Sequence, residues 1–373
     1  MFRISKAVSI GGFDHVKSLT IGGGSPIVAQ TMWKDRLSLS ELDGEEGAIT
    51  LSKIKRLEKL GCKLLRFGVP DIPAAEALGQ LSSMTSMPLV ADIHFDYKIA
   101  LRCLDFPVAK IRINPGNIGS AEKQKAVIEK AGKKNIPIRI GVNAGSLPVD
   151  LRKGFQDYSE ALVKAAEREL AIFDKYGFTN VLVSMKASRI ADNIKANRLL
   201  AERTDVPLHI GVTEAGPLIA GVVRNSAAIL DLLREGIGDT IRVSLTDSME
   251  NELIAAREIL LAASELMGKE SSRNEISGGV KIISCPRCGR YGFDTNAFLE
   301  RWLEKLYGLD SRISVAIMGC AVNGPGEAKD ADLGITGAGN KVLVFSRGKV
   351  IKTIEAEEAD EVFEEELKKT VKE

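Results

Sequence analysis

The sequence predicts an α/β protein in which an N-terminal (β/α)8 TIM-type barrel precedes a small C-terminal α+β domain. Eight short apolar segments alternate with helical stretches from about residue 27 to residue 266. Residues 267–279 are polar and rich in glycine, which is typical of a linker, and the pattern of elements changes after them. We therefore predict a barrel over residues 1–266, a linker over 267–279 and a second domain over 280–373.

Eight strand–helix repeats in roughly 240 residues are the number that a (β/α)8 barrel requires. A doubly wound open sheet has the same local pattern and is the alternative. Before the first repeat, Lys17–Ile21 and the glycines at 22–24 predict an extra hairpin that closes the bottom of the barrel. The eight strands are expected at Ile27–Thr31, Lys63–Phe67, Leu89–His94, Val108–Asn114, Ile136–Val142, Thr179–Lys186, Leu208–Thr213 and Thr240–Ser244.

The residues after the linker, about 95 in number, are too few for a second barrel and predict a small α+β domain. Asp294 is expected to cap a helix that Gly308 ends. The elements expected in this domain are a strand at Val280–Ile283, a helix to about Tyr307, a strand at Ile313–Met318, a hairpin of Lys341–Phe345 and Lys349–Ile354, and a charged helix from about Glu358 to Lys372.

Composition excludes several partners and compartments. The chain has 51 Lys and Arg against 50 Asp and Glu, so no bulk positive charge indicates nucleic acid or an anionic membrane. No apolar run is long enough to span a bilayer, and the N-terminus lacks the apolar core of a signal peptide. Five cysteines in a chain of 373 residues do not form a secreted disulfide framework. We therefore expect a cytoplasmic protein.

Three cysteines of the second domain predict an iron–sulfur centre. Cys285 and Cys288 form a CxxC pair, and Cys320 follows in a second loop rich in Gly and Pro. Three thiolates leave one corner of a four-iron cluster open to a weaker ligand, for which Glu327 is the nearest candidate. Zinc needs a fourth Cys or His, yet all three histidines lie in the barrel half. The remaining cysteines, Cys62 and Cys103, are expected to be buried packing residues.

Polar side chains gather at the predicted C-terminal ends of the barrel strands, where TIM barrels place their active sites. On strands 3 to 8 they recur at spacings of two or four, so each set can face the barrel axis. Cations come from five strands, whereas Asp92 and Glu214 are the only obvious acids nearby, so we expect a polyanionic substrate such as a diphosphate. The strand-end residues are Arg66, Asp92, His94, Lys110, Arg112, Asn114, Arg139, Asn143, Ser184, Lys186, His209, Thr213, Glu214, Arg242 and Ser244.

Some roles remain open at this stage. His94 and His209 suit hydrogen bonding or acid–base chemistry, and a structural role suits His209 equally well. One alternative function is a barrel aldolase or synthase with Lys186 as a Schiff-base lysine and a structural zinc domain. Another is an iron–sulfur electron carrier or scaffold without catalysis, but it leaves the strand-end cations unexplained.

Five stretches of the sequence have the pattern of a known family. They are Ala91–Tyr97, Arg112–Gly119, Gly141–Leu147, Ser284–Arg290 and Met318–Ala328. These stretches resemble the bacterial 4-hydroxy-3-methylbut-2-enyl diphosphate synthases, enzymes of the methylerythritol phosphate route to isoprenoids. They occur in family order and cover both halves of the chain. Ala321 stands where many members have Val, and Gln30-Thr31-Met32-Trp33 is looser than the family pattern.

The resemblance implies a two-electron reductive ring opening and dehydration of 2-C-methyl-D-erythritol 2,4-cyclodiphosphate, an oxidoreductase reaction. Flavodoxin or ferredoxin would supply the electrons through a 4Fe-4S cluster. The family's cluster ligands fall on Cys285, Cys288, Cys320 and Glu327. Its diphosphate-binding positions fall on Arg66, Arg112, Arg139, Asn143, Lys186, Arg242 and Ser244. With the strand-end set, the candidate catalytic residues are Glu327, Asp92, His94 and Glu214, and Asn114, His209 and Thr213 join the candidate substrate-binding residues.

A homodimer is also expected. The helix after the last barrel strand, about Met249–Leu266, must run back down the barrel for roughly 27 Å. The linker then starts near the bottom face, and about a dozen residues would reach the mouth only if nearly straight. A two-fold dimer in which each cluster domain caps the partner's barrel avoids this constraint, and the resemblance points the same way.

Overall fold

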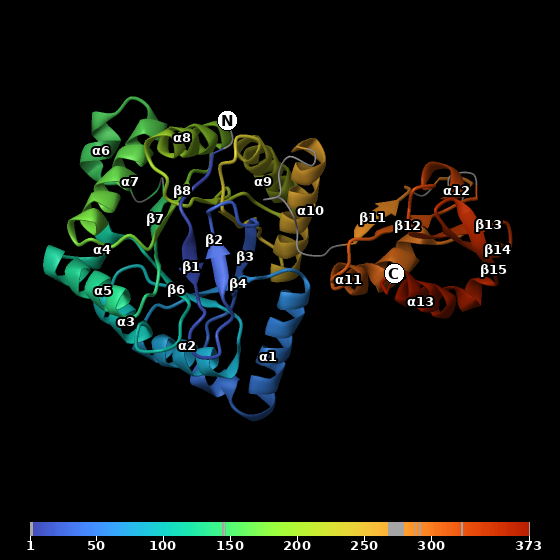
Figure 1. Ribbon diagram of the computed structural model, residues 1–373, viewed down its shortest axis with the longest axis horizontal. Coiled ribbons are helices and arrows are strands. Elements are labelled where there is room, and N and C mark those ends of the chain that lie inside the picture. Colours follow the sequence, from blue (N-terminus) through green and yellow to red (C-terminus); the bar gives the residue numbers. More distant parts are fainter. Residues whose placement is uncertain are drawn as a thin grey trace. The chain divides into compact units, whose positions relative to one another are not determined.

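The computed structural model describes residues 3–143, 145, 147–267, 280–286, 288–290, 292–321 and 324–372. The chain divides into two compact units, Met1–Ile276 and Ser277–Glu373 (Figure 1). Met267 is the last residue of helix α10, and the rest of the predicted linker, residues 268–279, lies outside the described residues.

The first unit is a closed parallel barrel. Its eight-stranded sheet has the order β8-β7-β6-β5-β4-β3-β10-β9, and a parallel bridge between Val183 of β8 and Leu208, next to β9, joins the two ends. This closure confirms the predicted (β/α)8 fold and rules out the open sheet. The strands are β3 (Val28–Met32), β4 (Leu64–Gly68), β5 (Leu89–Asp92), β6 (Lys110–Ile113), β7 (Ile138–Asn143), β8 (Val181–Lys186), β9 (His209–Ile210) and β10 (Thr240–Ile241).

Helices surround the barrel strands (Figure 1). Several begin at an aspartate that accepts a backbone N–H: Asp71 before α2, Asp96 before α3 and Asp157 before α7. The helices of this unit are η1 (Leu39–Leu42), α1 (Gly44–Lys59), α2 (Ile72–Met84), α3 (Tyr97–Cys103), α4 (Pro115–Ile118), α5 (Ala121–Lys133), α6 (Val149–Gly154), α7 (Tyr158–Lys175), α8 (Ile190–Arg203), α9 (Leu218–Leu233) and α10 (Met249–Met267).

Several strands end earlier than the sequence predicts. The strand β9 stops at Ile210, because Gly211 has a φ of 150° that takes the chain out of the strand conformation. Polar residues nevertheless continue at the same spacing into the loops, which explains why the predicted strands are longer than the observed ones. As a result, five predicted site residues lie just beyond their strands: His94, Asn114, Thr213, Arg242 and Ser244.

The predicted hairpin at the barrel bottom is present. Strands β1 (Val8–Ile10) and β2 (Leu19–Ile21) pair antiparallel. The fully buried Ile10 and Ile21 pack against apolar residues near the N-terminal ends of barrel strands, including Val28 and Leu64. The hairpin therefore closes the end of the barrel opposite the predicted site.

The second unit is a five-stranded mixed sheet with helices, in agreement with the predicted α+β class. Its order is β11-β12-β13-β14-β15, with the first three strands parallel and the last three antiparallel. Asp294 caps α11 by accepting the Ala297 N–H at 3.2 Å, as predicted. The elements are β11 (Lys281–Ser284), α11 (Thr295–Tyr307), β12 (Ser314–Met318), α12 (Gly324–Glu327), β13 (Leu333–Ala338), β14 (Lys341–Ser346), β15 (Lys349–Ile354), η5 (Ala356–Glu358) and α13 (Ala359–Thr370).

Aromatic side chains form the centre of this second core. Phe298 and Trp302 of α11 stack at 5.8 Å between ring centroids, and Phe363 of α13 meets both rings edge-on. These rings pack against buried apolar residues of β12 to β14. Among the described residues of the whole chain, no helix has the length and apolar character needed to cross a membrane.

Candidate active site

Asp92 is the central acid at the barrel mouth. Its carboxylate, at the end of β5, lies 3.4 Å from Arg66 Nε and 3.1 Å from Arg112 Nη1, while His94 Nε2 lies 3.5 Å away. The Asp92 side chain is only 2% exposed. Burial alone would raise the pKa of Asp92, but Arg66, His94 and Arg112 outweigh it and hold the pKa well below its usual range. Asp92 is therefore ionised at neutral pH and holds two arginines in place.

Replacing Asp92 by asparagine should lower the free energy of unfolding by about 3 kcal/mol at pH 7, because two buried guanidinium groups lose their anion. The folded pKa of Asp92 is depressed, so its stabilisation is complete above the unfolded value of about 3.9 and is lost as pH falls toward the folded pKa. The difference in the free energy of unfolding between wild type and variant, measured by urea unfolding, should therefore become smaller below about pH 4.

The matched control for this prediction is Asp150→Asn. Asp150 pairs with Arg168, but its side chain is 60% exposed, so its loss should leave stability nearly unchanged. Equal effects of the two substitutions would show that the Asp92 pairs do not stabilise the barrel.

A second group of basic side chains lies deeper and has fewer partners. Arg139, Lys110 and His209 are fully buried or nearly so. Within the described residues, Arg139 Nε and Nη1, Lys110 Nζ and His209 Nε2 have no hydrogen-bond partner. Buried donors without partners are costly, and an anion is the ligand that would satisfy them. This layer is therefore suited to binding a negatively charged group.

His209 is held as a neutral imidazole. Its Nδ1 lies 2.7 Å from the Thr240 hydroxyl, and the side chain is fully buried. Burial, Arg139 and Lys186 place the pKa of His209 well below its usual range. A neutral ring of this kind can hydrogen-bond a ligand but holds no proton to give at pH 7.

Two glycines make room for the cations. A Cβ on Gly141 of β7 would lie 2.4 Å from Arg112 Nε, so only glycine lets that guanidinium cross the strand. A Cβ on Gly211 would lie 3.1 Å from Lys186 Nζ and 2.3 Å from a backbone oxygen. Burial, Arg242 and Arg139 lower the pKa of Lys186 well below its usual range. Lys186 is therefore buried among the other basic side chains of the barrel mouth.

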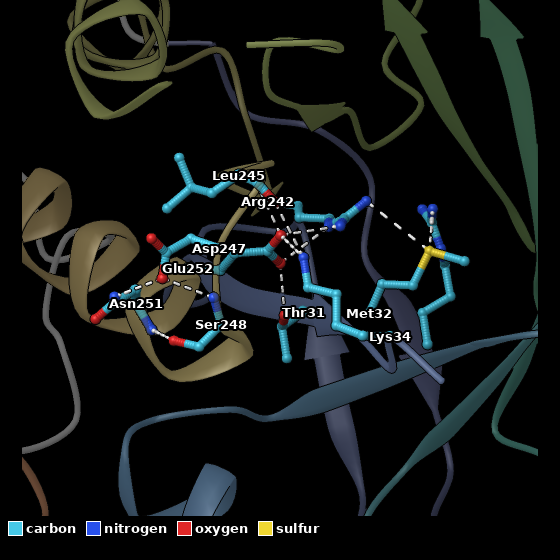
Figure 2. Close-up of polar contacts among 10 residues, drawn as sticks. Thr31, Met32, Lys34, Arg242, Leu245, Asp247, Ser248, Asn251 and Glu252 are labelled. Atoms are coloured by element: carbon cyan, nitrogen blue, oxygen red, sulfur yellow. Dashed lines mark hydrogen bonds and ion pairs between the residues drawn. The ribbon is translucent and has the colours of Figure 1, made fainter. Parts of the chain in front are cut away.

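Glu252 is the acid that the sequence analysis missed. It lies in the first turns of α10, its side chain is fully buried, and its carboxylate binds Arg242 through both Nε (3.3 Å) and Nη2 (3.1 Å) (Figure 2). Lys34 and Thr31 each donate to it at 2.6 Å. The expectation that Asp92 and Glu214 are the acids of this region is therefore incomplete. In the sequence, Glu252 is one of two acids in the first turn of α10, with Glu250, and nothing there distinguishes the buried one.

Glu214 lies apart from these pairs. It is exposed, has a positive φ of 53°, and accepts a hydrogen bond from the Ser188 hydroxyl at 3.0 Å.

Of the other predicted residues, Asn143 is the register neighbour of Lys186 between β7 and β8. The side chain of His94 is half exposed. Asn114, Thr213 and Ser244 are partly exposed in the loops that follow β6, β9 and β10.

The predicted cluster ligands gather in the second unit. The parallel pairing of Ser284 with Ile317 brings the ends of β11 and β12 to one edge of the sheet, and a cysteine loop follows each strand. Cys285, Cys288, Cys320 and Glu327 line one cavity of about 440 Å³. The Gly319 N–H donates to Cys285 Sγ at 3.1 Å and links the two loops.

This cavity fits an iron–sulfur cluster by its donors and its size. Three thiols and one carboxyl face it, and Arg290 also contributes to the lining. No three His, Cys, Asp or Glu side chains in the described ranges lie close enough to share a single metal ion. The four ligand candidates line one shared volume.

The two cysteines of the barrel unit are packing residues, as predicted. Cys62 and Cys103 are fully buried. Burial raises the pKa of both thiols to about 12. Both stay protonated at neutral pH and are poor nucleophiles and metal ligands.

Comparison with known proteins covers both units. The profile of the GcpE TIM-barrel domain matches residues 14–257, and that of the GcpE protein C-terminal domain matches residues 281–369. A protein of Treponema denticola is 49% identical over 98% of this chain and 96% of its own length. Proteins of Treponema pallidum (49%, covering 96% and 88%) and Thermodesulfovibrio yellowstonii (44%, covering 95% and 97%) are also similar. All three are named 4-hydroxy-3-methylbut-2-en-1-yl diphosphate synthase (flavodoxin).

Proposed function

We propose that this chain, which belongs to the GcpE family, converts 2-C-methyl-D-erythritol 2,4-cyclodiphosphate to 4-hydroxy-3-methylbut-2-enyl diphosphate. The reaction takes up two electrons, opens the cyclic diphosphate and releases a hydroxyl group as water, for which a proton is needed. The observation that carries the proposal is the pairing, in one chain, of a cationic barrel mouth with a cavity lined by three thiols and a carboxyl.

The barrel would bind the substrate through its diphosphate. Arg139 and Lys186 offer buried positive charge, and Arg66 and Arg112 are held beside them by Asp92. Guanidinium groups suit this task because they bind phosphate oxygens through two N–H groups at once. Asn114, Asn143, His209, Thr213, Arg242 and Ser244 complete the proposed binding set.

The acids of the proposed catalytic set differ in what they can do. Asp92 stays ionised because its arginines lower its pKa, so it suits holding cations better than giving a proton. His94 is half exposed and lies next to Asp92, which suits proton transfer with solvent. Glu214 is exposed at the end of its strand and is a second candidate for that step.

The cofactor we propose is a 4Fe-4S cluster held by Cys285, Cys288, Cys320 and Glu327 in the cavity of the second unit. Such a cluster supplies electrons one at a time and offers one iron with a replaceable ligand. The relatives' names include flavodoxin, which supports a flavodoxin as the donor here. The cytoplasm is the compartment that suits this chemistry best.

Iron and sulfide analysis of anaerobically purified protein tests this function. We expect about four irons and four sulfides per chain, with visible absorption. With reduced flavodoxin, the protein should convert the cyclic diphosphate to the linear product. One zinc per chain without visible absorption, together with trapping of a carbonyl substrate on Lys186 by borohydride, would instead support the Schiff-base alternative.

We also propose a homodimer in which each cluster domain serves the partner's barrel. Mixing an Arg112→Met chain with a Cys320→Ser chain should then restore activity, because mixed dimers combine an intact barrel with an intact cluster domain. Random exchange of equal amounts would give about one quarter of the wild-type sites, since half the dimers are mixed and each has one working site. A mixture that exchanges subunits, shown by mass spectrometry, yet stays inactive would place both parts of the site in one chain.

A further inference from the structure

Arg242 has one edge of its guanidinium group occupied by the protein. Its Nε and Nη2 bind the two oxygens of Glu252, which is the bidentate geometry of the strongest Arg–carboxylate pairs (Figure 2). Its Nη1 lies 3.9 Å from the Met32 thioether, which also accepts a hydrogen bond from Arg66 Nη2 at 2.9 Å. A thioether is a weak acceptor, so these nitrogens keep most of their capacity to bind an anion.

The Glu252 carboxylate is itself fixed on several sides. The Leu245 N–H donates to Oε1 at 3.1 Å, beside Lys34 Nζ, and the Thr31 hydroxyl donates to Oε2. Lys34 Nζ also donates to the Leu245 carbonyl at 3.1 Å. These contacts join β3, the loop after β10 and α10 at one carboxylate. A residue with this many partners in a fully buried position has one available orientation.

The start of α10 is also fixed by its own hydrogen bonds. The Asp247 carboxylate accepts from Ser248 N at 2.7 Å and from Asn251 Nδ2 at 2.6 Å. The Ser248 hydroxyl accepts the Asn251 N–H at 3.1 Å, which is a helix-capping contact (Figure 2). The turn that carries Glu252 therefore has little freedom to move.

We propose that Glu252 is a positioning residue for substrate binding: it fixes the Nε and Nη2 edge of Arg242 so that the Nη1 side is presented to the diphosphate. The inference rests on the proposed function, since it assumes that Arg242 binds that group. Burial would raise the pKa of Glu252, but Arg242, Lys34 and Thr31 outweigh it and lower the pKa, so the carboxylate keeps its charge at neutral pH. Lys34 offsets part of that charge from the exposed side, where its side chain is 32% accessible.

A double-mutant cycle separates positioning from a general structural effect. Affinity for inorganic diphosphate is measured by calorimetry in wild type, Glu252→Gln, Arg242→Met and the double variant. We expect Glu252→Gln to weaken binding about tenfold in the wild-type background and less than about twofold when Arg242 is already methionine. Equal losses in both backgrounds would show that Glu252 acts independently of Arg242 and would overturn the proposal.

Charge and geometry are separated by Glu252→Asp, which keeps the negative charge but is one methylene shorter. If the position of the carboxylate matters, Glu252→Asp should weaken diphosphate binding as Glu252→Gln does. An aspartate that binds diphosphate like wild type would reduce the role of Glu252 to charge balance and overturn the proposal. Should Glu252→Gln fail to fold, as judged by thermal unfolding, the aspartate variant replaces it in the cycle.

Glu250→Gln is the matched control, because Glu250 lies on the same helix and pairs with Arg56 at 3.6 Å outside the site. It should leave diphosphate affinity unchanged. In turnover assays, Glu252→Asp should raise KM with little change in kcat, the pattern of a lost binding contact. A wild-type protein that binds no diphosphate would refute the barrel site of the proposed function itself. If wild type binds diphosphate but the effects of the Glu252 and Arg242 substitutions on affinity simply add, only this inference is refuted.

Discussion

Replacing Cys320 by serine should remove the iron–sulfur cluster and reduce turnover to background. Cys320 follows β12, is 8% exposed and lines the same cavity as Cys285 and Cys288. A serine hydroxyl is a much poorer iron ligand than a thiolate, so two cysteines would remain for four irons. Iron and sulfide content and visible absorption of anaerobically purified protein measure the loss, and reduced flavodoxin with the cyclic diphosphate measures turnover.

Cys103→Ser is the matched control for Cys320→Ser. Cys103 is fully buried in the barrel unit, and burial raises its thiol pKa to about 12. Its substitution should cost some stability but leave the iron content unchanged. Glu327→Gln should keep most of the iron and lose turnover, because an amide is a poorer ligand and a poor proton carrier. A Cys320→Ser protein with wild-type iron and sulfide would place the cluster elsewhere.

The barrel could be predicted because its signals are local and repeated. Short apolar segments bounded by helical stretches identify strands without knowledge of their partners. Strand ends were harder, because polar side chains continue past the last paired residue. His94 and Thr213 keep the alternating pattern but lie in loops, since pairing stops at Asp92 and Ile210. Hydrogen bonding between strands, which the sequence does not show, sets those limits.

The cationic layer of the site was also predictable, because residues at the ends of parallel strands converge whatever their distance in sequence. Its acids were not. Glu252 lies 221 positions from Thr31, and only the packing of α10 against β3 brings the two into contact. Glu214 follows a barrel strand in the sequence, but its side chain accepts a hydrogen bond from Ser188 and takes part in none of the cation pairs described above. Its backbone has a positive φ.

The cysteine cavity depends both on local spacing in the sequence and on the pairing of strands that are distant in the sequence. The CxxC spacing is local and visible in the sequence. The approach of Cys320 depends on the parallel register of β11 with β12, in which Ser284 pairs with Ile317. Sequence motifs therefore predicted which residues line this cavity, and the sheet explains how the two cysteine loops meet.

Replacing Arg139 by methionine should weaken binding of the cyclic diphosphate by about 1.5–3 kcal/mol, or roughly 10- to 150-fold, because a buried charge-assisted contact to phosphate is lost. The free protein should be at least as stable as wild type. Arg139 is 2% exposed, and its Nε and Nη1 have no hydrogen-bond partner in the described part of the chain, so methionine removes a buried and poorly satisfied charge.

Arg112→Met is the comparison that makes this result specific. It should weaken substrate binding to a similar degree but also lower stability, because Asp92 then loses the partner 3.1 Å away. Calorimetric titration with the cyclic diphosphate and urea unfolding of the three proteins give both quantities, and the cluster spectrum should not change. Normal binding by Arg139→Met would mean that the diphosphate does not reach this layer. A large loss of stability would mean that Arg139 supports the barrel, so the two measurements together decide whether its buried charge is kept for the substrate or for the fold.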